Sequence, residues 1–216
     1  MSEYDCVIID YGVGNVLSVR RAFESLGAKA IISSDISVIE SVGRIILPGV
    51  GAFANGMKAL NDSGLADLIK VRVDSGVPIL GICLGMQLLF GGSEEFGVTQ
   101  GLELLPGEVK PLAGADFGEV RLKIPHIGWN GLVPHEGSCW DDTVLRSVRP
   151  LDEVYFAHSY MVETDDLGIQ LAQCLYGKNK VLAVVQRENI VGCQFHPEKS
   201  GEIGKQILSD FLCFSG

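Results

Sequence analysis

Short runs of residues that are apolar at every position most constrain how this chain folds. Cys6–Ile9 and Ile79–Ile82 are two such runs. A strand with one face in water alternates apolar and polar side chains, so an unbroken apolar run predicts a strand covered on both faces. Val16–Leu26 repeats apolar residues at helical spacing and stops at Gly27. Further helices are predicted over residues 36–41, 57–61 and 65–74. Strands that alternate with helices predict βαβ units and a doubly wound, mostly parallel α/β sheet.

The pattern changes in the second half of the chain. Residues 101–150 are rich in glycine and proline. Strands are predicted over residues 120–124, 154–157, 170–176, 181–186 and 190–195, and a closing helix over about 201–213. Short turns at 177–179 and 188–189 predict antiparallel hairpins. No internal repeat or low-complexity linker divides the sequence. We therefore predict a parallel sheet with an antiparallel extension, in one domain over residues 1–216.

Composition and charge exclude several classes of protein. The formal net charge is −10, which argues against a nucleic-acid-binding surface. Asp5 and Asp10 bracket the first apolar run, and no apolar stretch approaches the ~20 residues needed to span a bilayer. A cytoplasmic location is therefore predicted. The six cysteines contain no C-x-x-C pair, so no metal site is expected.

The segment Gly81-Ile82-Cys83-Leu84-Gly85 follows one of the apolar runs. It is the cysteine version of the G-x-S-x-G elbow, in which a sharp strand-to-helix turn raises a nucleophile above the sheet. Side chains on either flank would crowd such a turn, which explains the two glycines. A helix beginning at Leu84 would direct its free N–H groups at the sulfur and favour the thiolate. The ordinary alternative is a cysteine buried in a core strand.

A second segment, Gln194-Phe195-His196-Pro197-Glu198, follows the last predicted strand. In an extended segment, residues i and i+2 lie on the same face, so His196 and Glu198 can point into one site. A cysteine nucleophile needs a base to accept and return its proton, and the base needs a third group to orient it. Cys83, His196 and Glu198 supply these three roles.

The turn Pro48-Gly49-Val50-Gly51 also follows an apolar strand. Attack of a thiolate on an amide places negative charge on oxygen, and backbone N–H groups must stabilise this charge. The Leu84 N–H is one candidate donor, and the glycine-flanked Val50 peptide is the other. An ordinary turn between a strand and a helix is the alternative interpretation.

These segments together resemble a known family. Residues 47–51, 81–87 and 194–200 are similar to the class I, triad-type glutamine amidotransferases. Residues 10–15, 125–130 and 158–160 narrow the resemblance to the glutaminase subunits of imidazole glycerol phosphate synthases. The resemblance implies a flavodoxin-like fold and hydrolysis of glutamine to glutamate and ammonia through a Cys83 thioester, without a cofactor. It also implies a heterodimer with a (β/α)₈-barrel cyclase, which uses the ammonia to make imidazole glycerol phosphate and AICAR in histidine biosynthesis.

The resemblance also implies roles for individual residues. The glutamine-binding residues would be Gly49, Gly51, Gln87, Glu95, His158, Ser159 and Tyr160. The partner-facing residues would be Gly12, Asn15, Arg20, Arg21, Pro125, Ile127, Trp129, Asn130 and Lys199. The adjacent Glu94 is an alternative to Glu95. Core packing is the alternative for Trp129, and a solvated helix face for Arg20 and Arg21. His126 is expected in a turn or at the surface.

One departure from the family pattern leaves the partner open. Ile127 stands where the branch typically has methionine, next to Gly128-Trp129-Asn130. A paralogous subunit that supplies ammonia to a sugar amidotransferase in surface-polysaccharide biosynthesis is therefore an alternative. A cysteine hydrolase that acts alone and a non-catalytic regulatory subunit are further alternatives.

Gly12-Val13-Gly14 does not complete a dinucleotide-binding fingerprint, because Leu17 occupies the position of the last glycine.

Overall fold

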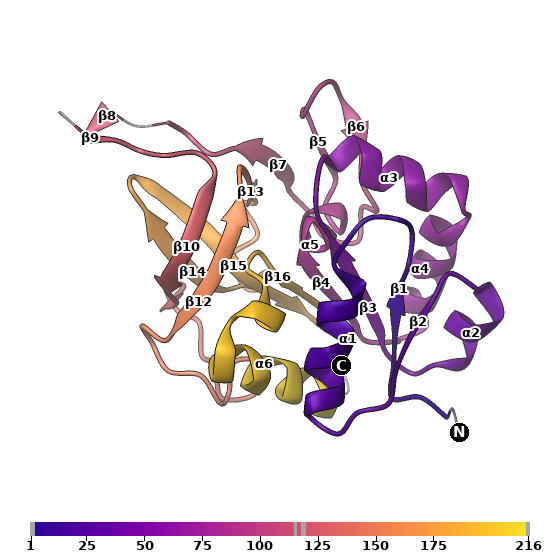
Figure 1. Cartoon of the computed structure of the whole chain (residues 1–216). Helices are drawn as coiled ribbons and strands as arrows, with labels where there is room; N and C mark the ends of the chain where they lie inside the picture. The colour runs from indigo at the N-terminus through magenta and orange to yellow at the C-terminus, as the bar shows by residue number, and fades with distance from the viewer. Residues whose placement is uncertain (1–2, 115, 118–119, 215–216) are drawn as a thin grey trace.

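The computed structural model describes residues 3–114, 116–117 and 120–214 and is built around an eight-stranded sheet (Figure 1). Its strand order is β11-β14-β15-β16-β4-β3-β1-β2. The parallel part contains β1 (Cys6–Ile9), β2 (Ala30–Ser33), β3 (Ile45–Gly49), β4 (Ile79–Cys83) and β16 (Ile190–Cys193). The antiparallel part contains β11 (Val133–Pro134), β14 (Gln170–Tyr176) and β15 (Asn179–Arg187). The predicted parallel sheet with an antiparallel extension is confirmed.

Both faces of the parallel strands are buried, as their unbroken apolar sequences require. In β1, Cys6 and Ile8 enter one hydrophobic cluster, whereas Val7 and Ile9 enter a second cluster on the other face. The first cluster is covered by α1 (Val16–Ser25) and α6 (Gly201–Cys213). The second is covered by α2 (Ile36–Ser41), α3 (Phe53–Asp62), α4 (Leu65–Asp74) and α5 (Leu84–Leu88). Figure 1 shows α1 and α6 together in front of the sheet.

Three smaller sheets are present among the described residues. A four-stranded sheet contains β13 (Tyr160–Glu163), β7 (Glu108–Pro111), β5 (Gly92–Ser93) and β6 (Thr99–Gln100), in this order. An antiparallel ribbon pairs β10 (His126–Gly131) with β12 (Glu153–His158), and β8 (Asp116–Phe117) pairs with β9 (Val120–Arg121). Two 3₁₀ turns, η1 (Leu167–Ile169) and η2 (Pro197–Lys199), complete the described structure.

Several helices and strands begin or end at other residues than predicted, because contacts between distant parts of the chain set their boundaries. The helix predicted to begin at Met57 begins at Phe53, because the carboxylate of Glu95 accepts a hydrogen bond from the Phe53 N–H at 2.8 Å. The predicted strand over residues 120–124 is wrong beyond Arg121, and regular pairing resumes at His126 against β12. The two predicted hairpins are confirmed, since β14, β15 and β16 pair antiparallel in sequence.

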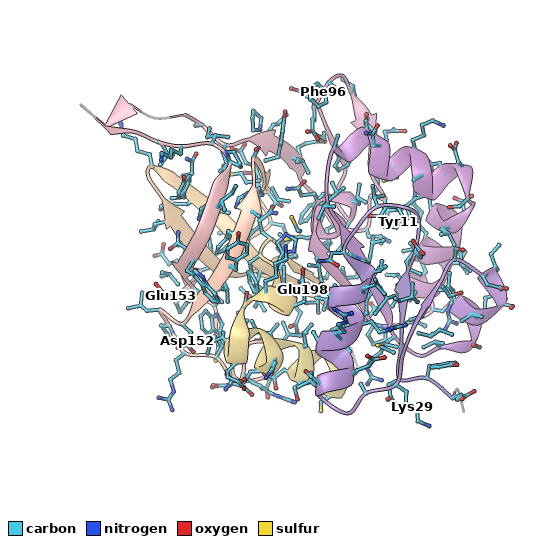
Figure 2. The ribbon with its side chains drawn as sticks, in the orientation of Figure 1. Tyr11, Lys29, Phe96, Asp152, Glu153 and Glu198 are labelled. Atoms are coloured by element: carbon cyan, nitrogen blue, oxygen red, sulfur yellow. The ribbon has the colours of Figure 1, made fainter. Side chains whose placement is uncertain are left out.

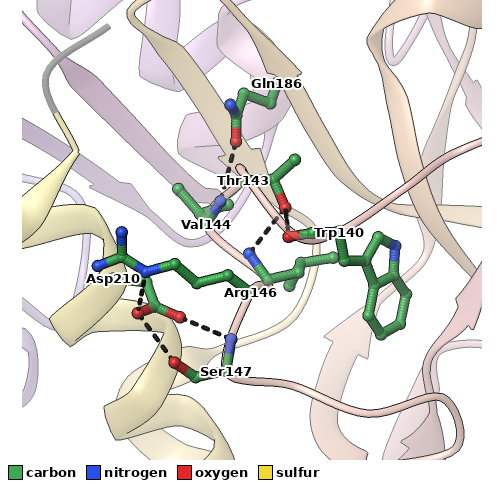
Figure 3. Close-up of polar contacts among 8 residues, drawn as sticks. Trp140, Thr143, Val144, Arg146, Ser147, Gln186 and Asp210 are labelled. Carbon is green, nitrogen blue, oxygen red and sulfur yellow. Dashed lines mark hydrogen bonds and ion pairs between the residues drawn. The ribbon is translucent and has the colours of Figure 1, made fainter.

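A polar cluster attaches α6 to the irregular segment before β12 (Figure 3). The Asp210 carboxylate is 6% exposed and accepts hydrogen bonds from Arg146 Nε at 2.9 Å, Ser147 N at 3.1 Å and Ser147 Oγ at 3.0 Å. Gln186 Oε1 accepts a bond from the Val144 N–H at 3.0 Å. Because these bonds satisfy a buried carboxylate, they stabilise the position of α6, the helix that follows η2 in the sequence.

None of the helices in the described ranges is both long enough and apolar enough to cross a membrane. The cytoplasmic location stays a prediction, and so does the assignment of residues 1–216 to one domain.

The elbow at Cys83 has the crowded geometry that its flanking glycines predict. Cys83 adopts φ 56° and ψ −110°, outside the regions that side chains prefer. A Cβ atom on Gly81 would lie 2.7 Å from Met86 Cα, and one on Gly85 would lie 1.7 Å from the Leu47 carbonyl oxygen. Glycine is therefore required at both positions because the backbones of β3, β4 and α5 meet there.

Replacement of Gly85 by alanine tests this close approach. We expect Gly85→Ala to lower the free energy of unfolding by about 3 kcal/mol, because the new methyl group must displace backbone. Gly43→Ala is the matched control, since Gly43 is exposed, has no neighbour within 4 Å of its Cβ position and lacks a left-handed backbone. We expect this control to change stability by less than about 0.5 kcal/mol. Urea unfolding measures both variants, and equal stabilities would contradict the elbow geometry.

Candidate active site

The order of the parallel strands brings three distant segments to one edge of the sheet. Strand β4 lies between β3 and β16, with Cys83 opposite Gly49 and Ile82 opposite Cys193. The carboxyl ends of parallel strands lie at the same edge, which is where ligands bind in open α/β sheets. The turn after β3 and the segment after β16 therefore emerge on either side of Cys83.

The side chains of Cys83, His196 and Glu198 lie together at this edge of the sheet. His196 Nδ1 lies 2.8 Å from Glu198 Oε1, and the two side chains are 4% and 1% exposed. The Cys83 sulfur is close enough to the His196 ring to contribute to its electrostatic surroundings. Figure 2 shows Glu198 at the centre of the molecule, where η2 contacts α1. The structure thus brings together the three side chains that the sequence assigned to nucleophile, base and orienting group.

The surroundings of His196 favour its protonated form. Burial alone would lower the pKa of His196, but hydrogen bonds to Cys83 and Glu198 and their negative charges raise it to about 9. A protonated imidazole at neutral pH stabilises a neighbouring thiolate, the reactive form of cysteine. Helix α5 spans only Leu84–Leu88. The full charge of a neighbouring imidazolium therefore outweighs the partial charge of this short helix.

Cys83 opens onto a cavity of about 570 Å³. Its lining residues are Val50, Gly51, Cys83, Leu84, Gln87, Glu95, Phe96, Pro125, Ile127, Ala157, His158, Ser159 and Tyr160. Every predicted glutamine-binding residue except Gly49 is in this set. Gly49 packs beneath the cavity, where a Cβ atom would lie 2.6 Å from the Tyr11 hydroxyl. A concave site with a few convergent polar groups is typical of a small-molecule site.

Gln87 and Gln194 connect the cavity wall to the sulfur. Gln87 Nε2 donates hydrogen bonds to the Tyr160 carbonyl and to Gln194 Oε1, each at 3.0 Å. Gln194 Nε2 lies 3.8 Å from Cys83 Sγ. Gln87 therefore uses its amide nitrogen within the protein. Sequence reasoning missed Gln194, although its place two residues before His196 puts it on the same face of an extended segment.

The two adjacent glutamates have different surroundings. Glu95 lines the cavity while one of its oxygens accepts the bond from Phe53 N. Glu94 instead forms an ion pair with Lys110 at 3.4 Å, and its side chain is 70% exposed. Phe96, which sequence reasoning also missed, lines the cavity and lies at the tip of the loop between β5 and β6 (Figure 2).

The turn after β3 is anchored by a hydrogen bond at Pro48 and is exposed to solvent at Val50 and Gly51. The Tyr11 hydroxyl donates a buried hydrogen bond to the Pro48 carbonyl at 2.7 Å. Burial and the nearby negative sulfur of Cys83 raise the pKa of Tyr11. Val50 is 42% exposed and Gly51 adopts φ 101°, so the turn is unpacked beyond its anchored proline. Val50 and Leu84, the two predicted oxyanion donors, both line the cavity beside Cys83.

The expectation that His126 lies in a turn or at the surface is wrong. His126 is 2% exposed and begins strand β10, where its side chain packs between aromatic rings. The alternation of a strand explains this position, because Ile127 and Trp129 on the opposite face are 61% and 54% exposed. Core packing is therefore excluded for Trp129.

The other residues that the resemblance assigned to a partner interface occupy varied positions. Pro125 and Ile127 line the main cavity. Asn15 follows the Gly12 turn and caps α1 by accepting a bond from the Ser18 N–H. Asn130 Nδ2 donates to the Leu175 carbonyl at 2.9 Å, which fixes this side chain within the described chain.

Four cationic side chains lie on or near α1 and η2. Arg20 forms an ion pair with Glu24 at 3.3 Å, whereas Arg21 lines a second cavity of about 310 Å³ with Lys205 and Glu198. Lys199 Nζ lies 5.9 Å from the centre of the Tyr155 ring. In the ranges that the structure describes, no three His, Cys, Asp or Glu side chains are grouped in a way that would hold a metal ion.

Comparisons with known proteins agree with this geometry. A family model described as glutamine amidotransferase class-I matches residues 7–213. The imidazole glycerol phosphate synthase subunit HisH 1 of Legionella pneumophila strain Paris is 48% identical over 208 residues, covering 95% of this chain and 97% of the relative. The HisH subunit of Geobacillus sp. strain WCH70 is 48% identical over 204 residues, covering 94% of each chain.

Solved structures show the same fold at lower sequence identity. A crystal structure of a glutamine amidotransferase superposes with a TM-score of 0.70 at 20% identity, covering 95% of this chain and 96% of that chain. PurLQS from Thermotoga maritima gives a TM-score of 0.66 at 20% identity, covering 96% of this chain and 97% of that chain. The chain therefore belongs to the class-I glutamine amidotransferase family, in the branch of imidazole glycerol phosphate synthase HisH subunits.

Proposed function

We propose that this chain hydrolyses glutamine to glutamate and ammonia and supplies the ammonia to an imidazole glycerol phosphate synthase in histidine biosynthesis. The observation that carries this proposal is that Cys83 lines the 570 Å³ cavity and lies beside the buried, hydrogen-bonded pair of His196 and Glu198. The names of relatives that are 46–48% identical over nearly the whole chain support the pathway.

In the proposed reaction, the Cys83 thiolate attacks the side-chain amide carbon of glutamine. The carbon–nitrogen bond then breaks, and the His196 imidazolium gives its proton to the leaving nitrogen, which departs as ammonia. A γ-glutamyl thioester remains on the sulfur. Neutral His196 next takes a proton from water, and the resulting hydroxide attacks the thioester to release glutamate. Glu198 keeps the imidazole in one orientation through both steps.

Negative charge develops on the substrate oxygen in each step and needs two N–H donors. The Leu84 N–H is one proposed donor, and the Val50 N–H is the other. Because the turn is anchored at Pro48 and unpacked at Val50 and Gly51, we propose that a bound partner reorients the Val50 peptide. The subunit alone would then be nearly inactive, which prevents the loss of ammonia to water.

The proposed partner is a (β/α)₈-barrel cyclase that converts the ammonia into imidazole glycerol phosphate and AICAR. Exposed apolar side chains at and near the cavity mouth support a protein partner there, because Phe96, Ile127 and Trp129 are 89%, 61% and 54% exposed. A partner seated on this rim would receive ammonia from the cavity without its passage through solvent.

Reconstitution with an imidazole glycerol phosphate synthase cyclase subunit tests the proposed function. We expect glutamate release from glutamine to rise at least about 100-fold when the liganded cyclase is added, since the second oxyanion donor is then in place. Cys83→Ala is expected to lower glutamine-dependent synthesis by a factor on the order of 10³ or more. Synthesis from added ammonium salt by the same variant complex is the control for assembly.

Two outcomes would contradict the proposal. Glutamine-dependent synthesis by the Cys83→Ala complex at the wild-type rate would exclude the thioester. Failure of the cyclase to bind or stimulate the chain, together with stimulation by a sugar amidotransferase, would assign the chain to surface-polysaccharide biosynthesis instead.

A matched pair of glutamate variants tests the glutamine-binding wall. Glu95→Gln is expected to raise the KM for glutamine about tenfold, because it weakens a charge-assisted bond to the substrate amino group. The glutamine side chain keeps an oxygen for the Phe53 N–H. Glu94→Gln removes the same charge outside the cavity and is expected to change KM less than about twofold. Steady-state glutaminase kinetics of the two complexes measure the difference, and equal KM values would contradict the assignment of Glu95.

A further inference from the structure

Two buried imidazoles lie against each other at the cavity wall, to which His158 contributes. His126 and His158 are register partners in the β10–β12 ribbon and are 2% and 5% exposed. His126 Nδ1 lies 3.1 Å from His158 Nε2, and His158 Nδ1 lies 2.8 Å from the Tyr160 carbonyl oxygen. The two rings therefore connect strand β10 to a residue that lines the cavity.

Only one arrangement of protons satisfies both contacts when the rings are neutral. A carbonyl oxygen only accepts hydrogen bonds, so His158 Nδ1 must carry a proton. His158 Nε2 is then an acceptor, and His126 Nδ1 must donate to it. Burial lowers the pKa of each ring to about 4, so both are neutral near pH 7. The pair is thus a directional chain of hydrogen bonds from His126 through His158 to Tyr160.

The Tyr160 carbonyl at the end of this chain also fixes the polar groups nearest the sulfur. It accepts a second hydrogen bond from Gln87 Nε2, at 3.0 Å. The same nitrogen donates to Gln194, whose amide nitrogen lies 3.8 Å from Cys83 Sγ. A change in the position of the Tyr160 carbonyl therefore affects Gln87, which lines the cavity, and through it Gln194, which lies beside the Cys83 sulfur.

At the other end of this series of hydrogen bonds, two aromatic rings hold the His126 ring in place. The His126 ring stacks on Phe156 at 4.7 Å and on Tyr176 at 3.9 Å between ring centres. The next residue, Ile127, is exposed on the opposite face of the strand and lines the cavity mouth. His126 consequently couples the position of strand β10 to the buried side of the cavity.

We propose that His126 is a positioning residue for glutamine binding, which acts through His158 to fix the Tyr160 carbonyl and Gln87. The inference rests on the proposed glutaminase function. It assigns a role to a residue that the substrate does not touch, and it makes strand β10 part of the machinery that shapes the cavity.

Three substitutions separate the hydrogen bond from the packing of the ring. His126→Leu fills the space but removes the donor. His126→Gln is polar, but its amide is one bond further from the backbone than Nδ1 of the histidine. His126→Asn places an amide N–H at the position of Nδ1, from which it can donate to His158 Nε2. We expect KM for glutamine in the cyclase complex to rise about tenfold in the first two variants, with kcat within about threefold of wild type. The asparagine variant should recover KM to within about threefold.

Tyr176→Phe is the matched control, because it removes a hydroxyl bond to the Lys123 carbonyl and keeps the ring that stacks on His126. It should leave KM within about twofold of wild type. The chain contains four histidines, so their ring nitrogens can be resolved by NMR in the ¹⁵N-labelled full chain. We expect His158 to be protonated at Nδ1 and bare at Nε2, and its Nε2 resonance to shift in His126→Leu but not in Tyr176→Phe.

Protonation of His158 at Nε2 in the wild-type chain would overturn the proposal, and so would an unchanged KM in a folded His126→Leu or His126→Gln variant. A KM that rises equally in the asparagine variant would also overturn it. Absence of glutaminase activity in the wild-type complex would instead contradict the proposed function, whereas the NMR pattern would still report on the imidazole pair.

Discussion

The proposed ion pair between the Cys83 sulfur and the His196 ring is the interaction on which the chemistry depends. Buried charges are costly unless they are paired and hydrogen-bonded. Here one imidazole contacts both the sulfur and the Glu198 carboxylate, whose side chain is 1% exposed. Removal of His196 would leave the Glu198 carboxylate buried without this hydrogen-bond partner. The three groups therefore act together, although Cys83 ends β4 whereas His196 and Glu198 lie in the segment after β16.

The surrounding fold places this unit with little freedom. Strand β4 is central in the sheet, and the contacts of Gly81 and Gly85 leave no room for a wider turn at Cys83. The Gln87 amide and the Tyr160 carbonyl hold the opposite wall. By contrast, Val50 is exposed beyond its anchored proline. A tightly packed elbow beside an exposed turn is the arrangement that the proposed completion of the site by a partner requires.

Local sequence patterns predicted the parts of the molecule whose structure depends mainly on residues that are close together in the sequence. Unbroken apolar runs identified the parallel strands, and glycine spacing identified the elbow. Side chains governed by distant contacts were not predictable in this way. The start of α3 depends on Glu95, and the burial of His126 depends on Phe156 and Tyr176. Gln194 was overlooked for another reason: its spacing to His196 was visible, but its role appears only when Gln87 is beside it.

The titration of His196 tests the central ion pair most directly. By NMR of the labelled full chain, we expect a pKa of about 9 in the wild type, against an ordinary value of 6.5. In Cys83→Ala the sulfur charge is absent, so the pKa should fall. Because folding raises this pKa, the bound proton stabilises the fold fully below about pH 6.5, and this stabilisation is lost as the pH rises through about 9. A neutral His196 at pH 7 in the wild type, or an unchanged pKa in Cys83→Ala, would contradict the account.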